Sequence, residues 1–242
     1  MPIARSILAT LAIAVGLPAT AAASAPPSEP DDTTATSAVP FAEREVVTIA
    51  GTGESGFSGD GGPARAARLD DLGDVEVGPD GTVYFVNGGR IRAVAADGTI
   101  DTVAGGGDED VDIGSAATEV HLGGLAGFGI GPDGTMYVTT DTLGELLIVD
   151  PDGTITDVVD DESLADAAVT PDGTVHAISQ RGALFELDDG ELIETLPIGN
   201  NVRYTLAPRL AVGPAGEVLF GDATPLRDGE VVRERALIGV VD

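Results

Sequence analysis

The sequence predicts an all-β fold made of repeated four-stranded antiparallel units. Two observations carry this prediction: a recurring pair of turns flanked by short apolar segments, and the recurrence of these pairs along the chain. No long amphipathic helical pattern interrupts the repeats. Because 43% of the 242 residues are apolar, the chain can form a globular core in spite of its charge.

The first turn of each unit lies between two apolar segments with the character of β-strands. Proline fixes φ at the first central position of a turn, and glycine accepts the positive φ that a tight hairpin needs. Each turn therefore predicts a β-hairpin. The four turns are Pro79–Gly81, Pro132–Gly134, Pro171–Gly173 and, in a degenerate form, Pro214–Gly216.

A second hairpin is expected after each first one, because the flanking residues alternate between apolar and polar with period two. Its turns are Ala96–Gly98, Pro151–Gly153, Asp188–Gly190 and Arg227–Gly229, and their shared Asp recurs at intervals of 55, 37 and 39 residues. Four strands in roughly 40 residues are typical of a β-propeller blade. We therefore expect a β-propeller of four to five four-stranded antiparallel blades over residues 41–242.

The long first interval indicates an inserted loop. Residues 104–122 line up with residues 50–69, which precede the first unit. In the earlier copy we expect a short helix over Ala64–Leu69, with Asp60 near its N-cap and Pro63 in its first turn. His121 lies in the later copy and is expected at the surface.

Several motifs of this region resemble those of bacterial NHL-repeat β-propellers. They are Val47–Gly53, Gly56–Ala64, Arg90–Val94 and Thr102–Gly105, and the resemblance continues in weaker form to the end of the sequence. The Asn-His-Leu tripeptide that names the repeat is present in no unit, and the family commonly has six blades whereas four full units are found here. Four or five blades are both open, and residues 45–50, read as an outer strand, or residues 236–241 would complete a blade from the other terminus.

The N-terminal segment is typical of a secretory signal peptide over residues 1–23. Arg5 supplies the positive charge, Ser6–Leu17 the apolar core, and Ala21–Ala23 a small-residue cleavage site. An apolar run of about 12 residues is too short to span a bilayer, which needs about 20, so we expect no membrane span and a secreted product. Residues 24–40 are rich in Pro, Ser, Thr and Asp, and are expected to form a flexible spacer.

The charge excludes some functions. With 41 acidic and 12 basic residues, the formal net charge is −29, so phosphate backbones and anionic lipids would repel the chain. We therefore expect no nucleic-acid partner. The absence of cysteine excludes disulfides and thiolate metal sites. Of the two histidines, His176 is expected to be a hydrogen-bonded strand residue.

A calcium site is one reading of the acidic loop in the second copy. Asp108, Asp110 and Asp112 alternate in a glycine-rich segment, where their carboxylates could converge on an ion. The glycine falls one place late for the usual calcium loop, and the aligned residues 54–63 lack these aspartates. The other reading is a solvated acidic loop that needs no cofactor.

The alignment of the repeats also predicts where a ligand would bind. The residue that opens the inner strand is Asp74, Gly127, Asp166 or Arg209, and two positions after Asp74 stands Glu76. If the inner strands line a central channel, then Asp74, Glu76, Asp166 and Arg209 meet at its mouth, where propellers characteristically bind ligands.

Two functions follow as expectations. The first is a secreted, non-catalytic scaffold that binds a protein, a glycan or a small molecule on its loop face or channel mouth. The alternative is a metal-dependent extracellular hydrolase or lyase, because propellers similar to this one include lactonases and lyases. The shortage of histidine and of asparagine favours the binding function.

Overall fold

The computed structural model describes residues 46–141, 144–160, 164–196, 208–213, 216–221, 226–227, 230–231 and 238–241. The expected signal peptide, the expected spacer and the expected start of the propeller at residue 41 lie outside these residues. The described part contains β-strands, one short 3₁₀ turn and no α-helix. None of its helical segments has the length and apolar character needed to cross a membrane.

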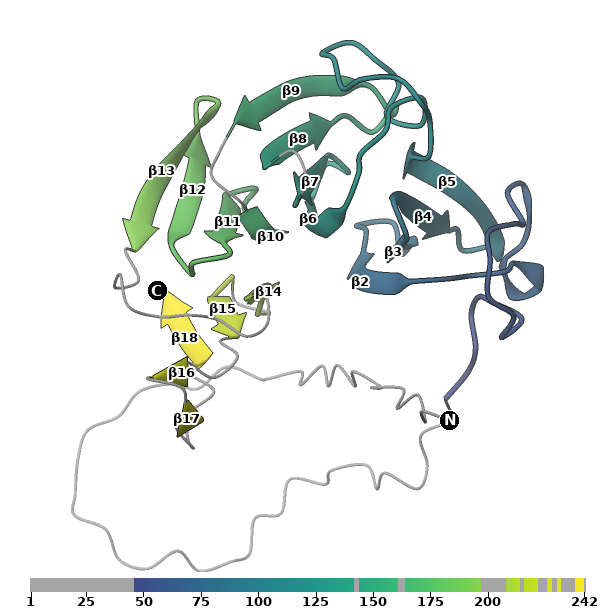
Figure 1. Ribbon diagram of the computed structural model, residues 1–242, viewed down its shortest axis with the longest axis horizontal. Helices are drawn as coiled ribbons and strands as arrows, with labels where there is room; N and C mark the ends of the chain where they lie inside the picture. The colour runs from purple at the N-terminus through teal and green to yellow at the C-terminus, as the bar shows by residue number, and fades with distance from the viewer. Residues whose placement is uncertain are drawn as a thin grey trace, which may run out of the picture. The chain divides into compact units, whose positions relative to one another are not determined.

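Three sheets have at least four strands and follow one another along the chain (Figure 1). The first has the order β1-β5-β4-β3-β2, the second β6-β7-β8-β9 and the third β10-β11-β12-β13, and all their pairings are antiparallel. Their strands are β1 (Gly62–Pro63), β2 (Leu72–Val77), β3 (Val83–Asn87), β4 (Arg90–Val94), β5 (Thr99–Gly105), β6 (Leu125–Ile130), β7 (Met136–Thr140), β8 (Glu145–Val149), β9 (Ile155–Asp160), β10 (Leu164–Val169), β11 (Val175–Ser179), β12 (Leu184–Asp188) and β13 (Glu191–Leu196).

The fourth unit departs from the expected pair of hairpins. Its main sheet has three strands, β14 (Arg209–Val212), β15 (Val218–Gly221) and β18 (Ile238–Val241), in the order β14-β15-β18. The expected second hairpin is present as a separate two-stranded sheet of β16 (Leu226–Arg227) and β17 (Glu230–Val231). Thus β18, rather than the strand next in sequence, pairs with β15.

The turns form as the sequence predicts in the first three units. In each first turn the Asp side chain accepts a hydrogen bond from the backbone N–H two residues later, at 2.9 Å for Asp80, 3.0 Å for Asp133 and 3.1 Å for Asp172. The glycine that follows each Asp has φ between 86° and 94°. These local hydrogen bonds explain why Asp is preferred at this position.

The first strands of the sheets bring the units together. β2 contacts β6, β6 contacts β10, and β10 contacts β14. Apolar side chains fill the spaces between neighbouring sheets. One core cluster joins Val86 and Ile91 of the first sheet to Phe128 and Leu147 of the second. Successive four-stranded antiparallel sheets whose first strands lie together are the architecture of a β-propeller.

The two aligned loops are structural copies of each other. Gly51 N–H donates to Ala64 O at 2.9 Å, and Gly105 N–H donates to Ala117 O at 2.7 Å. Each loop also pairs with the outermost strand of the sheet that follows it, through Pro63 and Thr99 in the first copy and through Ala116 and Thr154 in the second. The inserted loop predicted from the sequence is therefore the second copy of a loop that pairs along the outer edge of a sheet.

The short helix expected over Ala64–Leu69 is wrong in length and in capping. Only Ala64–Ala66 are helical, as the 3₁₀ turn η2, and Ala67 is already extended. No side chain caps η2. Asp60 instead pairs with the fully buried Arg92 and accepts a hydrogen bond of 2.9 Å from the Thr102 hydroxyl. A buried guanidinium needs a carboxylate partner, and this requirement explains the position of Asp60 better than a helix cap does.

The outer strand expected over residues 45–50 is also absent in the described part of that segment, residues 46–50. Val46, Val47 and Ile49 are exposed, and the short strand β1 takes the edge of the first sheet by pairing with β5. At the other end of the sequence, β18 joins the sheet of its own unit. Neither segment completes a sheet of the opposite end.

His121 is exposed, as expected, whereas His176 differs in one respect. His176 lies buried in β11, but its Nδ1 has no hydrogen-bond partner, and the nearest carboxylate oxygen, Glu186 Oε1, is 3.8 Å away. Burial lowers the pKa of His176, so the neutral imidazole is favoured.

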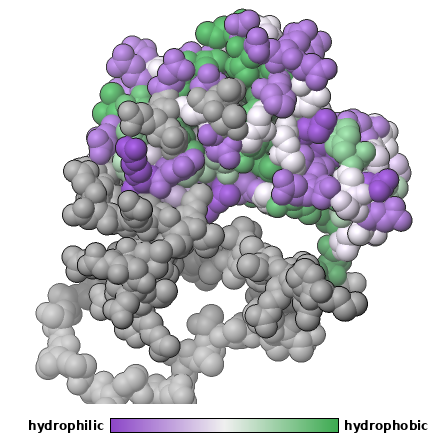
Figure 2. All heavy atoms as spheres, in the orientation of Figure 1, coloured by the Kyte–Doolittle hydropathy of each residue, from purple (hydrophilic) through white to green (hydrophobic). Residues whose placement is uncertain are grey.

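On the face drawn in Figure 2, hydrophilic residues cover much of the described surface, with hydrophobic ones between them.

Candidate functional site

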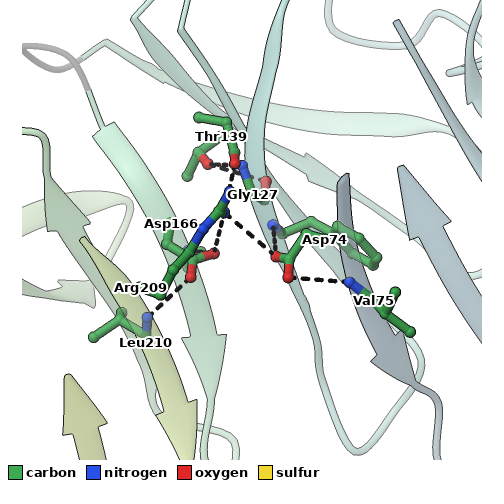
Figure 3. Close-up of polar contacts among 10 residues, drawn as sticks. Asp74, Val75, Gly127, Thr139, Asp166, Arg209 and Leu210 are labelled. Atoms are coloured by element: carbon green, nitrogen blue, oxygen red, sulfur yellow. Dashed lines mark hydrogen bonds and ion pairs between the residues drawn. The ribbon is translucent and has the colours of Figure 1, made fainter. Parts of the chain in front are cut away.

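Charged side chains from three first strands meet in one cluster. Asp74 lies on β2, Asp166 on β10 and Arg209 on β14, and the guanidinium of Arg209 lies between the two carboxylates (Figure 3). Arg209 Nη1 is 3.8 Å from Asp74 Oδ2 and 3.9 Å from Asp166 Oδ1. The repeat position singled out in the sequence thus brings three of the four predicted residues together. We call Asp74, Glu76, Asp166 and Arg209 the inner-strand cluster.

Asp74 joins the first two sheets through backbone hydrogen bonds. Its Oδ1 accepts the N–H of Val75 on its own strand at 3.0 Å, and its Oδ2 accepts the N–H of Phe128 on β6 at 3.4 Å. Part of this carboxylate is thereby used to fix neighbouring strands. The side chain still keeps 21% of its surface accessible.

Asp166 repeats the same arrangement between the third and fourth units. Its Oδ1 accepts the N–H of Ala167 and its Oδ2 the N–H of Leu210 on β14, both at 2.9 Å (Figure 3). The residue is only 2% exposed. Each of these aspartates therefore bonds to the N–H that follows it and to the equivalent N–H of the next unit.

Gly127 occupies the same register position on β6 and leaves the space that Arg209 uses. A Cβ at Gly127 would overlap Asp166 Oδ1 and would lie 2.9 Å from Arg209 Nη1. Arg209 Nη1 donates to Ala126 O at 2.6 Å, so the side chain of the fourth unit reaches the second. The hydroxyl of Thr139 fixes Gly127 through hydrogen bonds of 3.0 Å to its N–H and its C=O.

Burial changes the ionisation of Asp166. Desolvation and the negative charge of Asp74 raise its pKa well above the usual value, and the hydrogen bond from Leu210 and the charge of Arg209 oppose them only in part. Asp166 therefore holds its proton to a higher pH than an ordinary aspartate does. The cluster is consequently less negative than its formal charges suggest.

Glu76 lies two residues after Asp74 on β2, and therefore on the same face of the strand. Burial and the charge of Asp74 raise its pKa to about 7. Among the described residues, no side-chain hydrogen bond or ion pair joins it to Arg209. Glu76 therefore lies on the same strand as Asp74, and its carboxyl group titrates near neutral pH.

The three aspartates of the acidic loop lie apart from this cluster. Asp108, Asp110 and Asp112 are exposed on the segment before the second sheet. Within the described part of the chain, no three His, Cys, Asp or Glu side chains are grouped so that they could hold a metal ion. Calcium binding by this loop stays a prediction.

The roles of Gly127 and Arg92 could not be recognised from the sequence. Gly127 can be aligned with the other units, but an alignment cannot show that Asp166 Oδ1 and Arg209 Nη1 occupy the space left by its missing side chain. Arg92 is one of two arginines in β4, and the sequence does not distinguish the buried Arg92 from the partly exposed Arg90. The partner of Arg92, Asp60, lies 32 residues away, which only the fold reveals.

No known family model matches the chain, and no curated protein matches its sequence. Similar solved structures include virginiamycin B lyase from Staphylococcus aureus, with 15% identity, a TM-score of 0.44, and coverage of 62% of this chain and 51% of that one. A streptogramin B lyase has 14% identity and a TM-score of 0.44, with coverage of 65% and 50%. A gluconolactonase from Xanthomonas campestris has 15% identity and a TM-score of 0.46, with coverage of 66% and 56%.

The matched region spans about half of each of these proteins. At 14–15% identity, no activity and no residue role is transferred from them to this chain.

Proposed function

We propose that this chain is a non-catalytic binding protein that holds a hydroxyl-rich ligand, such as a glycan, at the inner-strand cluster. The observation that carries the proposal is the meeting of Asp74, Asp166 and Arg209 from one register position of three units. Repeated scaffolds commonly carry their binding sites on a few varied positions of a constant framework. Here the backbone N–H groups that bind Asp74 and Asp166 lie at equivalent positions of the units, whereas the charged side chains differ from unit to unit.

The ionisation of the cluster favours a neutral polar ligand over an ion. Asp166 and Glu76 both have raised pKa values, and Asp74 is matched by Arg209. The cluster therefore offers hydrogen-bond donors and acceptors together, with little net charge. Sugar hydroxyl groups need this mixture, because each hydroxyl both donates and accepts.

Two groups of the cluster remain available to such a ligand. The side chain of Arg209 is 47% exposed, and among the described residues only its Nη1 makes recorded contacts. Glu76, on β2 of the first sheet, is also partly exposed. These two groups would contact the ligand, while Asp74 and Asp166 hold the strands.

Saturation-transfer NMR with a panel of neutral tetrasaccharides (cello-, chito-, manno- and xylotetraose) tests the proposal. We expect one class to bind and Glu76→Ala to weaken it about tenfold, since a lost hydrogen bond to a charged or partly buried group costs about 1.5 kcal/mol. Glu194→Ala on the exposed outer strand β13 is the matched control. Equal affinity of the two variants, or no binding of any tetrasaccharide, contradicts the proposal.

The second candidate function is a hydrolase or lyase that acts at the same cluster. The sequence favours a metal-dependent form of it, but the described carboxyl groups of the cluster are not grouped so that they could hold a metal ion. The pKa of about 7 at Glu76 favours catalysis, because a general acid or base works best when its pKa is near the working pH. Turnover of a simple γ-lactone with added Ca²⁺ or Zn²⁺ that Glu76→Gln abolishes would establish catalysis in place of binding alone.

The cellular setting belongs to the same proposal. We infer an exported protein with an extracellular ligand and without a nucleic-acid partner. A signal-peptide reading of residues 1–23 and the net charge of −29 support it.

A further inference from the structure

A cleft lies between the first and second sheets, and Asp74, Asp166 and Arg209 are not among the residues that line it. Its volume is about 280 Å³, close to the lower end of the range for small-molecule sites. One wall is formed by Tyr84 of β3 and Val103 of β5, and the other by Met136 of β7 and the turn between β8 and β9. Thr118 of the inserted loop lies at its edge.

The charged groups that line this cleft are all negative. They are Asp150 and Asp152, and no Lys, Arg or His is among the lining residues. Asp152 is exposed and its Oδ1 caps the turn by accepting the N–H of Thr154 at 3.0 Å. Asp150 is partly buried, and within the described part of the chain its side chain accepts one long hydrogen bond, of 3.4 Å, from the Thr156 hydroxyl to Oδ1. Asp150 therefore keeps an acceptor oxygen for a ligand.

The remaining lining supplies apolar contact. Tyr84, Val103 and Met136 are partly buried or buried, and they belong to or pack against the core cluster between the two sheets. An aromatic ring and a thioether make favourable contacts with a flat apolar body, and an aromatic face also attracts a cation. A carboxylate beside such a surface suits a ligand that has a positive head and an apolar body.

We propose that this inter-sheet cleft is a binding site for a small organic ammonium ion, anchored by Asp150 and packed against Tyr84 and Met136. The strongly negative chain raises the local concentration of cations, and the cleft then selects by shape. Tyr84 is the cross-strand neighbour of Glu76, but Asp74, Asp166 and Arg209 do not line the cleft. The proposal does not depend on the function proposed for the inner-strand cluster.

The test is a titration of the ¹⁵N-labelled full chain with benzylammonium in 150 mM NaCl (~8 Å screening length), with benzyl alcohol as the neutral analogue of the same shape. We expect benzylammonium to shift the amide signals of Thr118, Gly134 and Gly153, which line the cleft. Benzyl alcohol should bind at least about tenfold more weakly, since it cannot form the charge-assisted hydrogen bond. Equal affinities, or shifts that map elsewhere, overturn the proposal.

Two variants and a control distinguish the cleft from general charge attraction. Asp150→Asn should weaken benzylammonium binding about tenfold, whereas Asp157→Asn on β9, which does not line the cleft, should leave it unchanged. Thr118→Trp should block the cleft from its exposed edge without a change in charge. If Asp150→Asn disturbs the fold, Thr118→Trp decides: retained binding overturns the proposal and lost binding supports it.

Discussion

Glu76 shows how one side chain can connect the pH of the medium to the stability of the fold. Its pKa is raised from 4.5 to about 7, chiefly because the surrounding strands remove water from the carboxyl. A raised carboxyl pKa means that the folded chain holds the proton more tightly than the unfolded chain. The free energy of unfolding therefore falls as pH rises from about 4.5 to 7, and it loses nothing further from this group above that range.

Replacement of Glu76 by Gln should remove this dependence, because Gln resembles the protonated acid. At pH 8 we expect Glu76→Gln to be more stable than the unchanged chain by on the order of 2 kcal/mol, with allowance for solvent screening of a partly exposed group. At pH 4 the two should be equally stable. Urea unfolding at both pH values measures the difference, and an equal gain at pH 4 would show that charge is not the cause.

The turn is the element that the sequence specifies most completely. In the turn between β6 and β7, Asp133 accepts the N–H of Thr135, and this hydrogen bond lowers the pKa of Asp133. A lowered carboxyl pKa gives stability that is present above pH 4 and is lost as pH falls through the folded value. We expect Asp133→Ala to lower the free energy of unfolding by about 1 kcal/mol at pH 6, and by much less at pH 2.5.

Asp133→Asn is the matched variant for the turn, because it removes the charge but keeps an oxygen that can accept the hydrogen bond. Its stability at pH 6 should lie between that of Asp133→Ala and that of the unchanged chain, because a neutral amide oxygen accepts a weaker hydrogen bond than a carboxylate does. Thermal unfolding of both variants at pH 6 and pH 2.5 gives the comparison. A loss for Asp133→Asn as large as that for Asp133→Ala would mean that charge, and not the hydrogen bond, stabilises the turn.

Short sequence patterns correctly predicted the turns and strands that are stabilised by residues close to one another in the sequence. The Asp-Gly turns and the strands beside them depend on residues two to four positions apart, and these were correct in three units. The helix over Ala64–Leu69 failed because Asp60 has a stronger partner in Arg92, far away in the sequence. The same limit applies to His176, whose unpaired Nδ1 follows from packing between strands, and to the pairing of β18 with β15.

The meeting of three candidate residues could be predicted from the sequence, but their hydrogen bonds could not. The register of the repeats placed Asp74, Asp166 and Arg209 at equivalent points, and the structure brings them together. The backbone hydrogen bonds of the two aspartates could not be inferred, because they join strands of different sheets. The space at Gly127 likewise became visible only with Arg209 in place.

At the scale of the whole molecule, a formal net charge of −29 makes self-repulsion a general destabilising force. Salt reduces the repulsion between exposed charges that lie farther apart than the Debye length, about 10 Å at 0.1 M. We expect the Tm to rise by several degrees between 0.02 and 0.5 M NaCl, as measured by calorimetry. A Tm that is unchanged, or that rises equally with an uncharged osmolyte at the same osmolality, would contradict this explanation.

Because β15 pairs with β18, the last strand in the sequence, the fourth sheet can be completed only late in the synthesis of the chain. Apart from β1, which pairs with the later strand β5, the strands of the first three sheets pair with their neighbours in the sequence, so most of each sheet can form as it is made. The fourth sheet cannot: β15 presents an open edge while β16 and β17 are synthesised, and it stays open until Ile238–Val241 arrives. During that interval the nascent chain exposes unpaired backbone groups, and a chaperone or a strand from another chain would have its best opportunity to bind there.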